Sequence, residues 1–287
     1  MKKIENLKKK KNLDIFLYNN IYFFYDIYCP FIDFSSYHDN YFFKIPLNYI
    51  AKYNLVNDYK LFFEKNIKSN NLLYITFDNN DQIKILKEIK IDFLKAKKIY
   101  YQLDYKFDKK INIYDSFFSE IFLLIQMKNN LETLCLNFSY LKNLKIDNDV
   151  FNSLNDLKSL EHIELDYIQF YKPFKIILPN LKTIRFNNCK NIDFDENSTK
   201  NIKYLELDET DIKFGIKYKF DNLEVLNINK SNIDIEFISL TKIKSLKSSK
   251  IEIIENIINY SSLQKFSNLY ISQLSFKEEQ KLIELFL

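Results

Sequence analysis

The sequence predicts an α/β solenoid in which each repeat contributes one short parallel β-strand, and three observations predict it. Apolar residues recur in triplets whose second and third members follow the first by three and five places, and four neighbouring triplets begin 21 residues apart. A small hydrogen-bonding side chain stands eight places after three of the four starts. The chain of 287 residues contains a single glycine, Gly215, so other residues must form its turns.

Four triplets define the repeat, and they start at Leu160, Leu181, Ile202 and Leu223. Within each triplet the second and third residues are two positions apart, so both point to the same side of an extended chain. This pattern is typical of a short strand that is buried on one face. The equal spacing further predicts that successive strands pair in parallel, with about 15 residues returning on the outer side of each coil.

The residue eight places after each start lies where the chain turns back inward. Backbone N–H and C=O groups at this turn would be buried without partners, and a nearby side chain can supply the missing hydrogen bonds. We expect this role for a set of small polar or thiol side chains: Asn80, Ser139, Cys189, Thr210 and Ser231. Cys189 is therefore interpreted as a buried structural residue and not as a nucleophile.

These repeats resemble those of the leucine-rich repeat family, whose units place apolar residues at the same spacing and Asn, Cys or Thr at the turn. Further copies of the triplet begin at Leu72, Leu131, Ile243 and Phe266. Between residues 84 and 130 the register is poor, and the best fit is Ala96, Ile99 and Tyr101. The resemblance implies a horseshoe-shaped leucine-rich repeat solenoid over residues 71–275, built from short units of about 21 residues.

A solenoid exposes its first and last coils, so atypical ends are expected. Residues 1–70 lack the repeat, are rich in aromatic residues and contain a helix-like stretch over Pro46–Ile67; we interpret them as an amino-terminal cap, with a small independent module as the alternative. Residues 276–287 follow a capping-box spacing at Ser275 and Glu278 and are expected to form a short carboxyl-terminal capping helix.

Strand residues that alternate with the apolar pair face the other side of the sheet. The resemblance implies that this side is the concave surface, where proteins of the family bind their partners. The candidate protein-binding residues on it are His162, Glu164, Asp166, Arg185, Asn187, Tyr204, Glu206, Asp208, Asn227 and Asn229.

Purely structural roles are available for most of these candidates. Glu164, Arg185 and Glu206 occupy equivalent positions on successive strands, so they are expected to pair as a ladder of charges. Asn and Asp at a strand end often bond the turn that follows. His162 and Tyr204 are the aromatic members of the set, and aromatic side chains dominate interface hot spots.

The composition excludes several classes of enzyme and metal site. A single glycine rules out phosphate-binding loops, dinucleotide fingerprints and nucleophile elbows. Three scattered cysteines and two remote histidines offer neither a disulfide framework nor the spacing of a known metal motif. The sequence therefore predicts no catalytic residue, no metal and no cofactor. Glu164 beside His162 is the one acid–base pair that the repeat face offers.

The most favoured function is a non-catalytic protein-binding scaffold, and its partner is another protein. No apolar run is long enough to span a membrane, and the stretch after the first lysines is interrupted by charged residues, so a cytoplasmic protein is expected. Two alternatives remain. Ile45-Pro46-Leu47 faintly resembles the start of an F-box, which would make the chain a substrate-recognition adaptor. The basic residues 1–11 could bind nucleic acid, although the net charge of +4 argues against this partner.

Overall fold

The computed structural model describes the chain in several segments. The described residues are 42–45, 47, 50, 56–57, 60, 72–77, 81–88, 97–103, 130–139, 145–213, 215–236, 240, 242–249 and 268–271. The chain divides into two compact units, residues 1–141 and 142–287. The helical cap expected over residues 276–287 lies outside the described residues, as does the basic segment 1–11.

The described strands of the first unit are parallel neighbours in chain order. They are β1 (Phe42–Ile45), β2 (Leu72–Phe77), β3 (Lys98–Leu103) and β4 (Thr133–Asn137). One helix, α5 (Asp81–Glu88), follows β2. Strand β1 falls within residues 1–70, where the sequence shows no repeat, and it nevertheless pairs in parallel with β2.

The weak triplet at Ile99 and Tyr101 is confirmed, because both residues are buried and pair with Leu134 and Leu136 of β4. The register predicted for β2 is wrong by two residues. Ile99 pairs with Leu73, and Tyr101 pairs with Ile75, so Leu73 and Ile75 are the inward residues of this strand. The sequence had placed Ile75 and Phe77 in those positions.

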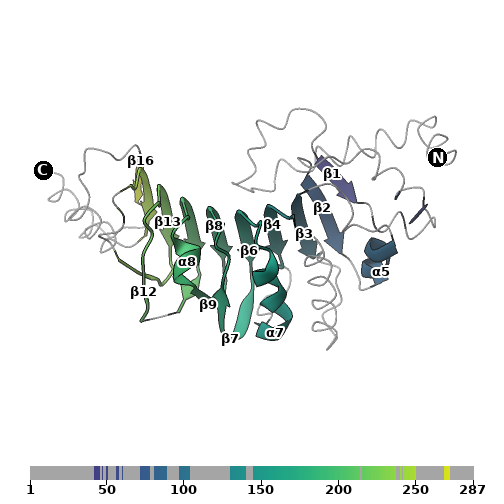
Figure 1. Cartoon of the computed structure of the whole chain (residues 1–287), viewed down its shortest axis with the longest axis horizontal. Helices are drawn as coiled ribbons and strands as arrows, with labels where there is room; N and C mark the ends of the chain where they lie inside the picture. The colour runs from purple at the N-terminus through teal and green to yellow at the C-terminus, as the bar shows by residue number, and fades with distance from the viewer. Residues whose placement is uncertain are drawn as a thin grey trace, which may run out of the picture. The chain divides into compact units, whose positions relative to one another are not determined.

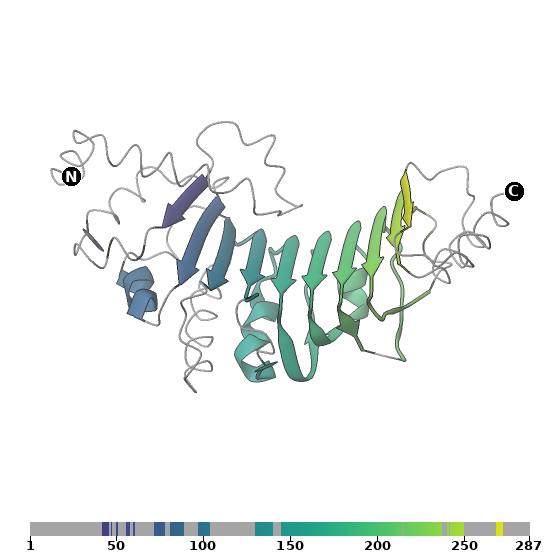
Figure 2. The ribbon, with the colours of Figure 1, turned by 180° about the vertical axis from the view of Figure 1, so that it is seen from behind.

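In the second unit one strand from each repeat joins a parallel sheet, which we call the main sheet (Figures 1 and 2). Its strands are β6 (His162–Asp166), β8 (Thr183–Asn187), β10 (Tyr204–Asp208), β13 (Val225–Asn229), β15 (Ser245–Ser248) and β16 (Asn268–Ile271). The register keeps every triplet aligned, so Ile163, Ile184, Leu205 and Leu226 form one inward row. All four side chains are fully buried, which confirms the strands predicted from the repeat.

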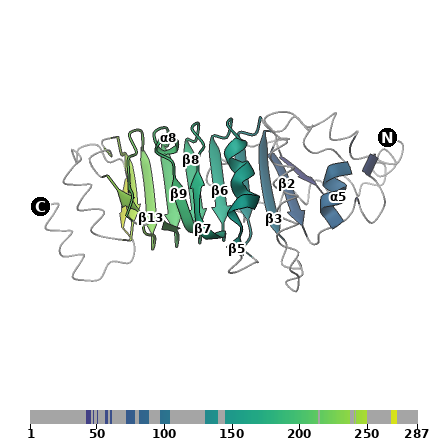
Figure 3. The same cartoon turned by 60° about the horizontal axis from the view of Figure 1, so that its bottom comes forward.

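The return segments of the second unit form a second layer (Figure 3). A four-stranded parallel sheet contains β5 (Lys145–Ile146), β7 (Gln169–Ile176), β9 (Lys190–Phe194) and β11 (Asp211–Ile212), and β12 (Lys217–Tyr218) pairs with β14 (Asp234–Ile235). Between these strands lie short helical turns, α7 (Asn148–Phe151), the 3₁₀ helix Asn152–Asp156 and α8 (Glu196–Thr199). Units of 21 residues leave room for little more than one helical turn.

Aromatic side chains fill the space between the two layers. Phe151 packs edge-on against Phe170 at 4.9 Å between ring centroids, and Phe170 stacks on Phe174 at 4.8 Å. One coil further on, Phe186 of the main sheet stacks on Phe194 of the second layer at 6.0 Å. The phenylalanines of these described coils therefore fill the interior between the two layers.

The turns after the main-sheet strands are joined by the hydrogen bonds that the sequence predicts. The backbone N–H of Cys189 donates to Thr210 Oγ1 at 3.2 Å, and the N–H of Thr210 donates to Ser231 Oγ at 2.9 Å. The Cys189 thiol donates to the carbonyl of Leu165 at 3.2 Å. Each buried side chain thus satisfies the turn of the preceding coil, and Cys189 has a structural role.

A left-handed residue stands immediately before the turn position of each coil, which is Ile168, Cys189, Thr210 or Ser231, and none of these four left-handed residues is glycine. They are Tyr167, Asn188, Glu209 and Lys230, with φ between 45° and 62°. Only asparagine among them tolerates this conformation well. The conformation has a use, because it directs the N–H of Tyr167 to the carbonyl of Asn187 at 2.8 Å on the next coil. Gly215, at φ 85°, lies in the return segment between β11 and β12.

A second ladder, which the sequence reasoning missed, precedes each strand. The side-chain amides of Asn180, Asn201 and Asn222 donate to the carbonyls of Lys158, Pro179 and Lys200 at 2.7–2.9 Å. The same 21-residue spacing links these asparagines, so the period itself contained the signal.

We expect Thr210→Val to lower the free energy of unfolding by about 2 kcal/mol, because the buried N–H of Cys189 loses its acceptor. Urea unfolding followed by circular dichroism measures the change. Thr183→Val is the matched control, since Thr183 is also buried in the main sheet and its hydroxyl forms none of the hydrogen bonds seen among the described residues. Equal losses in both variants would contradict the turn ladder.

The left-handed turns lead to a second prediction. Glycine at Lys230 relieves the unfavourable φ of 46°, whereas glycine at Lys203, which has no positive φ, relieves nothing. Lys230→Gly should therefore be about 1 kcal/mol less destabilising than Lys203→Gly. Thermal unfolding of the two variants under identical conditions compares them, and the reverse order would show that the turn is not strained.

Candidate functional site

The strands of the main sheet place the candidate residues on one surface, which we call the ladder face. It consists of the residues that alternate with the inward row on β6, β8, β10 and β13. Register pairs Glu164 with Arg185, Arg185 with Glu206, and Glu206 with Asn227. All ten residues proposed from the sequence are therefore brought onto one side of adjacent strands, because the side-chain period of a strand is two.

The central row of the ladder face is held by charge. Arg185 Nη1 lies 2.9 Å from Glu164 Oε1, and its Nε lies 3.6 Å from Glu206 Oε1. The charge ladder expected from the sequence is confirmed by these pairs. The side chain of Glu164 is only 3% exposed and that of Arg185 is 16% exposed, so this pair is shielded from water more than an ordinary surface ion pair.

Tyr204 joins the central row to the next strand. Its hydroxyl donates to Glu206 Oε2 at 2.5 Å and accepts from Asn227 Nδ2 at 3.1 Å. Burial and the neighbouring Glu206 carboxylate raise the pKa of Tyr204 above its ordinary value, so it remains a neutral donor. The sequence analysis had singled out Tyr204 as an aromatic anchor. It missed the hydrogen bond to Glu206, although residues two apart on a strand share a face and can therefore contact each other.

A second row of polar side chains is formed by the last residue of each strand. Asn229 Nδ2 donates to Asp208 Oδ1 at 2.6 Å, which ties β13 to β10. In the first unit Asn137 Oδ1 accepts the N–H of Ser139 at 3.0 Å, which is the turn-bonding role expected of an asparagine at a strand end. The turn-bonding role predicted for this row therefore occurs at Asn137, and the lateral bond between Asn229 and Asp208 is an addition that the sequence did not predict.

Asp166 is a strongly perturbed carboxyl group of the ladder face. It is 7% exposed. Burial, together with the nearby carboxylates of Glu164 and Glu206, raises its pKa to about 7, and Arg185 opposes this shift. Cys189 beneath it is also buried, which raises the pKa of its thiol and keeps it protonated.

The ladder face becomes more accessible along the sheet. Glu164 and Asp166 are buried, whereas Asn187, Glu206, Asp208 and Asn227 are half-exposed. His162 is half-exposed, and its Nε2 lies 3.9 Å from a carboxylate oxygen of Glu161. The part of the face that a partner can reach therefore lies on β8, β10 and β13, together with His162 at the start of β6, whereas Glu164 and Asp166 are buried.

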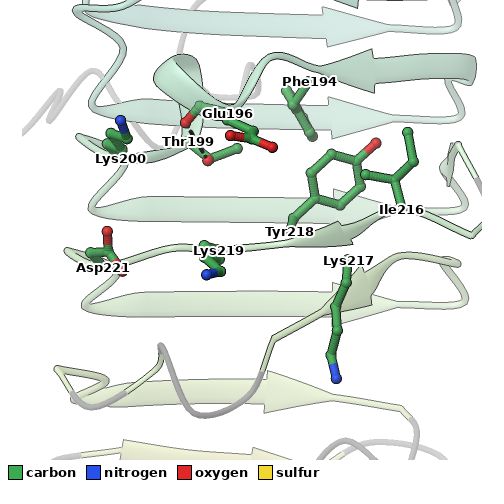
Figure 4. Close-up of a pocket in the computed structure, with 9 residues that line it drawn as sticks. All are labelled: Phe194, Glu196, Thr199, Lys200, Ile216, Lys217, Tyr218, Lys219 and Asp221. Carbon is green, nitrogen blue, oxygen red and sulfur yellow. Dashed lines mark hydrogen bonds between the residues drawn. The ribbon is translucent and has the colours of Figure 1, made fainter.

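Neither described pocket lies on the ladder face. One cavity of about 160 Å³ lies between return segments and is lined by Phe194, Ile216 and Tyr218 together with charged residues that include Lys200 and Glu196 (Figure 4). This volume is below the usual range for small-molecule sites. The Tyr218 hydroxyl donates to Asp193 Oδ1 at 2.6 Å, which is a structural bond within the second layer.

Within the described segments, no three His, Cys, Asp or Glu side chains are grouped so as to hold a metal ion. The helices in that part of the chain are all too short or too polar to cross a membrane.

The arrangement of each coil decides the fold. One parallel strand per repeat and constant register at 21 residues occur together on β6, β8, β10 and β13, and a hydrogen-bonding side chain stands at the turns after β8, β10 and β13. The fold is that of a leucine-rich repeat protein. The expected fold class is therefore confirmed, with extended return segments in place of long helices.

Among solved structures, the chain is similar to an internalin from Listeria monocytogenes, at 16% identity over 74% of this chain and 71% of the internalin, with a TM-score of 0.37. It is also similar to a leucine-rich repeat protein from Leptospira interrogans, at 16% identity over 69% of this chain and 60% of that protein, with a TM-score of 0.35. No protein-family model matches the sequence, and no curated protein matches it.

Asp166 gives the ladder face a pH dependence. Because its pKa is about 7 in the folded chain and ordinarily 3.8, the folded state holds an extra proton between these values, so stability falls as pH rises from about 4 to 7. We expect Asp166→Asn to remove this slope and to be stabilised relative to wild type at pH 8 by roughly 2 to 4 kcal/mol. Urea unfolding at pH 5 and pH 8 tests it; an unchanged slope would show that Asp166 ionises normally.

Proposed function

We propose that the protein is a non-catalytic scaffold that binds another protein through the accessible part of the ladder face. The observation that carries this proposal is the interlocked row of Arg185, Tyr204, Glu206 and Asn227, whose side chains are fixed by contacts across three strands. Fixing long side chains before binding lowers the entropy lost when the complex forms.

The surroundings of the row support a protein partner. The reachable surface is one face of a parallel sheet, and it combines an aromatic residue, an arginine and half-exposed amides; aromatic residues and arginine are enriched at protein interfaces. Repeat proteins use such surfaces because each added coil extends the sheet without changing its neighbours. The partner's identity does not follow from these residues.

Catalysis receives no support from the same surface. His162 Nε2 lies 3.9 Å from a carboxylate oxygen of its chain neighbour Glu161, and the buried Glu164 pairs with Arg185. Cys135 and Cys189 are buried and form no disulfide with each other. Buried thiols without a disulfide are compatible with a reducing compartment, and we propose a cytoplasmic location. The F-box-like and nucleic-acid alternatives rest on Ile45-Pro46-Leu47 and on residues 1–11, which are not among the residues that define the ladder face.

Site-specific photo-cross-linking tests the proposal. A photoreactive benzoylphenylalanine at Asn227 should form adducts with a partner in lysate from the source cells, whereas the same group at Lys172, exposed on β7 in the second layer, should not. Adducts are detected by gel mobility and identified by mass spectrometry.

Competition controls for specificity. Excess unlabelled wild-type protein should abolish the Asn227 adduct, and a competitor carrying Lys172→Glu should do the same. A competitor carrying Glu206→Lys should be at least about fivefold weaker, because it reverses a charge within the fixed row. Circular dichroism confirms that both competitors are folded. Adducts at Lys172 alone, or equal competition by all three proteins, would refute the proposed binding face.

A further inference from the structure

We infer that the ladder face takes a positively charged protein segment, which places an arginine or lysine side chain against Glu206 and Asp208 on β10. This inference rests on the proposed function and specifies the chemistry of the partner. It is carried by the balance of charges on the face, by the direction of the hydrogen bonds in the row, and by the contrast with the charge of the whole chain.

The first argument is that the arginine of the face is already engaged. Arg185 lies closer to buried Glu164, at 2.9 Å, than to Glu206, at 3.6 Å. Glu164 is almost fully buried, so the arginine cannot be released to Glu206 without leaving a carboxylate uncompensated in the interior. The guanidinium of Arg185 therefore compensates mainly Glu164 and only partly Glu206, whose side chain is 23% exposed.

The second argument concerns Asp208, which is half-exposed two residues after Glu206 and on the same face. It accepts a hydrogen bond from the neutral amide of Asn229 at 2.6 Å and forms no ion pair within the described segments. On β6, β8 and β10 this face carries the carboxylates of Glu164, Glu206 and Asp208 against the cation Arg185, and Asp166, whose pKa of about 7 leaves it partly protonated at neutral pH. This surface therefore has an excess of negative charge.

The third argument is the direction of the hydrogen bonds. Asn227 donates to Tyr204, Tyr204 donates to Glu206, and Asn229 donates to Asp208. In each of these bonds the donor is a side chain of the ladder face itself. The second carboxylate oxygen of Asp208 accepts none of these three hydrogen bonds and is available to a partner. A partner that supplies several donors and a positive charge satisfies this surface better than a neutral one, and guanidinium and ammonium groups do both.

The fourth argument is that this surface differs from the rest of the protein. The whole chain has a net charge of +4, so a basic partner has no general electrostatic attraction to it. A basic segment is attracted only where carboxylates outnumber cations. Charge complementarity at the ladder face would thus orient the partner as well as bind it.

Synthetic peptides test the charge preference directly. Three fluorescein-labelled peptides of ten residues alternate serine with arginine, glutamate or glutamine, and binding to the full chain is measured by fluorescence anisotropy at about 50 mM salt, where the Debye length exceeds 10 Å. The arginine peptide should bind more tightly than the other two. Asp208→Asn should weaken it about fivefold, the size expected for one partly exposed charge pair.

The matched control is Asp234→Asn, which removes the same charge from an exposed position on β14 in the second layer and should leave binding unchanged. Three results would overturn the inference: no preference for the arginine peptide, preference for the glutamate peptide, or equal weakening by both substitutions. A thermal unfolding curve for each variant shows that the comparison is made on folded protein.

Cross-linking to the natural partner distinguishes a failure of this inference from a failure of the proposed function. Adducts formed through the photoreactive group at Asn227 report whether the face binds protein, whatever the charge of the segment. Sequencing the cross-linked peptide then reports its charge, and a segment rich in lysine or arginine is expected. An adduct with an acidic or uncharged segment would retain the scaffold function and reject a basic partner.

Discussion

Constant register between successive strands is the constraint on which the rest of the structure depends. When each strand begins 21 residues after the last, every inward leucine lies over its equivalent, and every turn meets a side chain that can bond it. The ladder face follows from the same register, since Glu164, Arg185 and Glu206 become neighbours only because no strand slips. A shift of one residue would exchange the two faces of a strand.

The inward rows and turn residues were predictable because the same residue types recur every 21 positions in the sequence. The register of β2 was not, because its sequence Leu-Leu-Tyr-Ile-Thr-Phe has apolar residues on both faces of the strand and fits two alignments equally well. Pairing with Ile99 on β3 decides between them. The left-handed turns at Tyr167, Glu209 and Lys230 were equally hidden, since these residue types do not favour that conformation.

The membership of the candidate site was predictable from alternation along the strands, and its lateral charge pairing followed from the repeat. Its accessibility was not. Glu164 and Asp166 have the same place in their strand as Arg185 and Asn187, yet they are buried and the latter two are half-exposed. Burial depends on what surrounds each coil, which the period does not encode. This difference in burial distinguishes the half-exposed residues, which a partner can reach, from Glu164 and Asp166, which are buried among them.

The turn hydrogen bonds also give the coils a direction. Cys189 depends on Thr210, Thr210 depends on Ser231, and the N–H of Lys230 depends on Ser249 Oγ at 3.0 Å, so each turn is completed by the coil that follows it in the chain. Removing a following coil therefore leaves these backbone donors without acceptors. Removing a preceding coil does the same to a different set of groups, because the side-chain amides of Asn201 and Asn222 and the thiol of Cys189 donate to carbonyls of the coil before them. Each coil is thus completed from both sides, and a cut at either end of the stack leaves a chemically different set of unsatisfied groups.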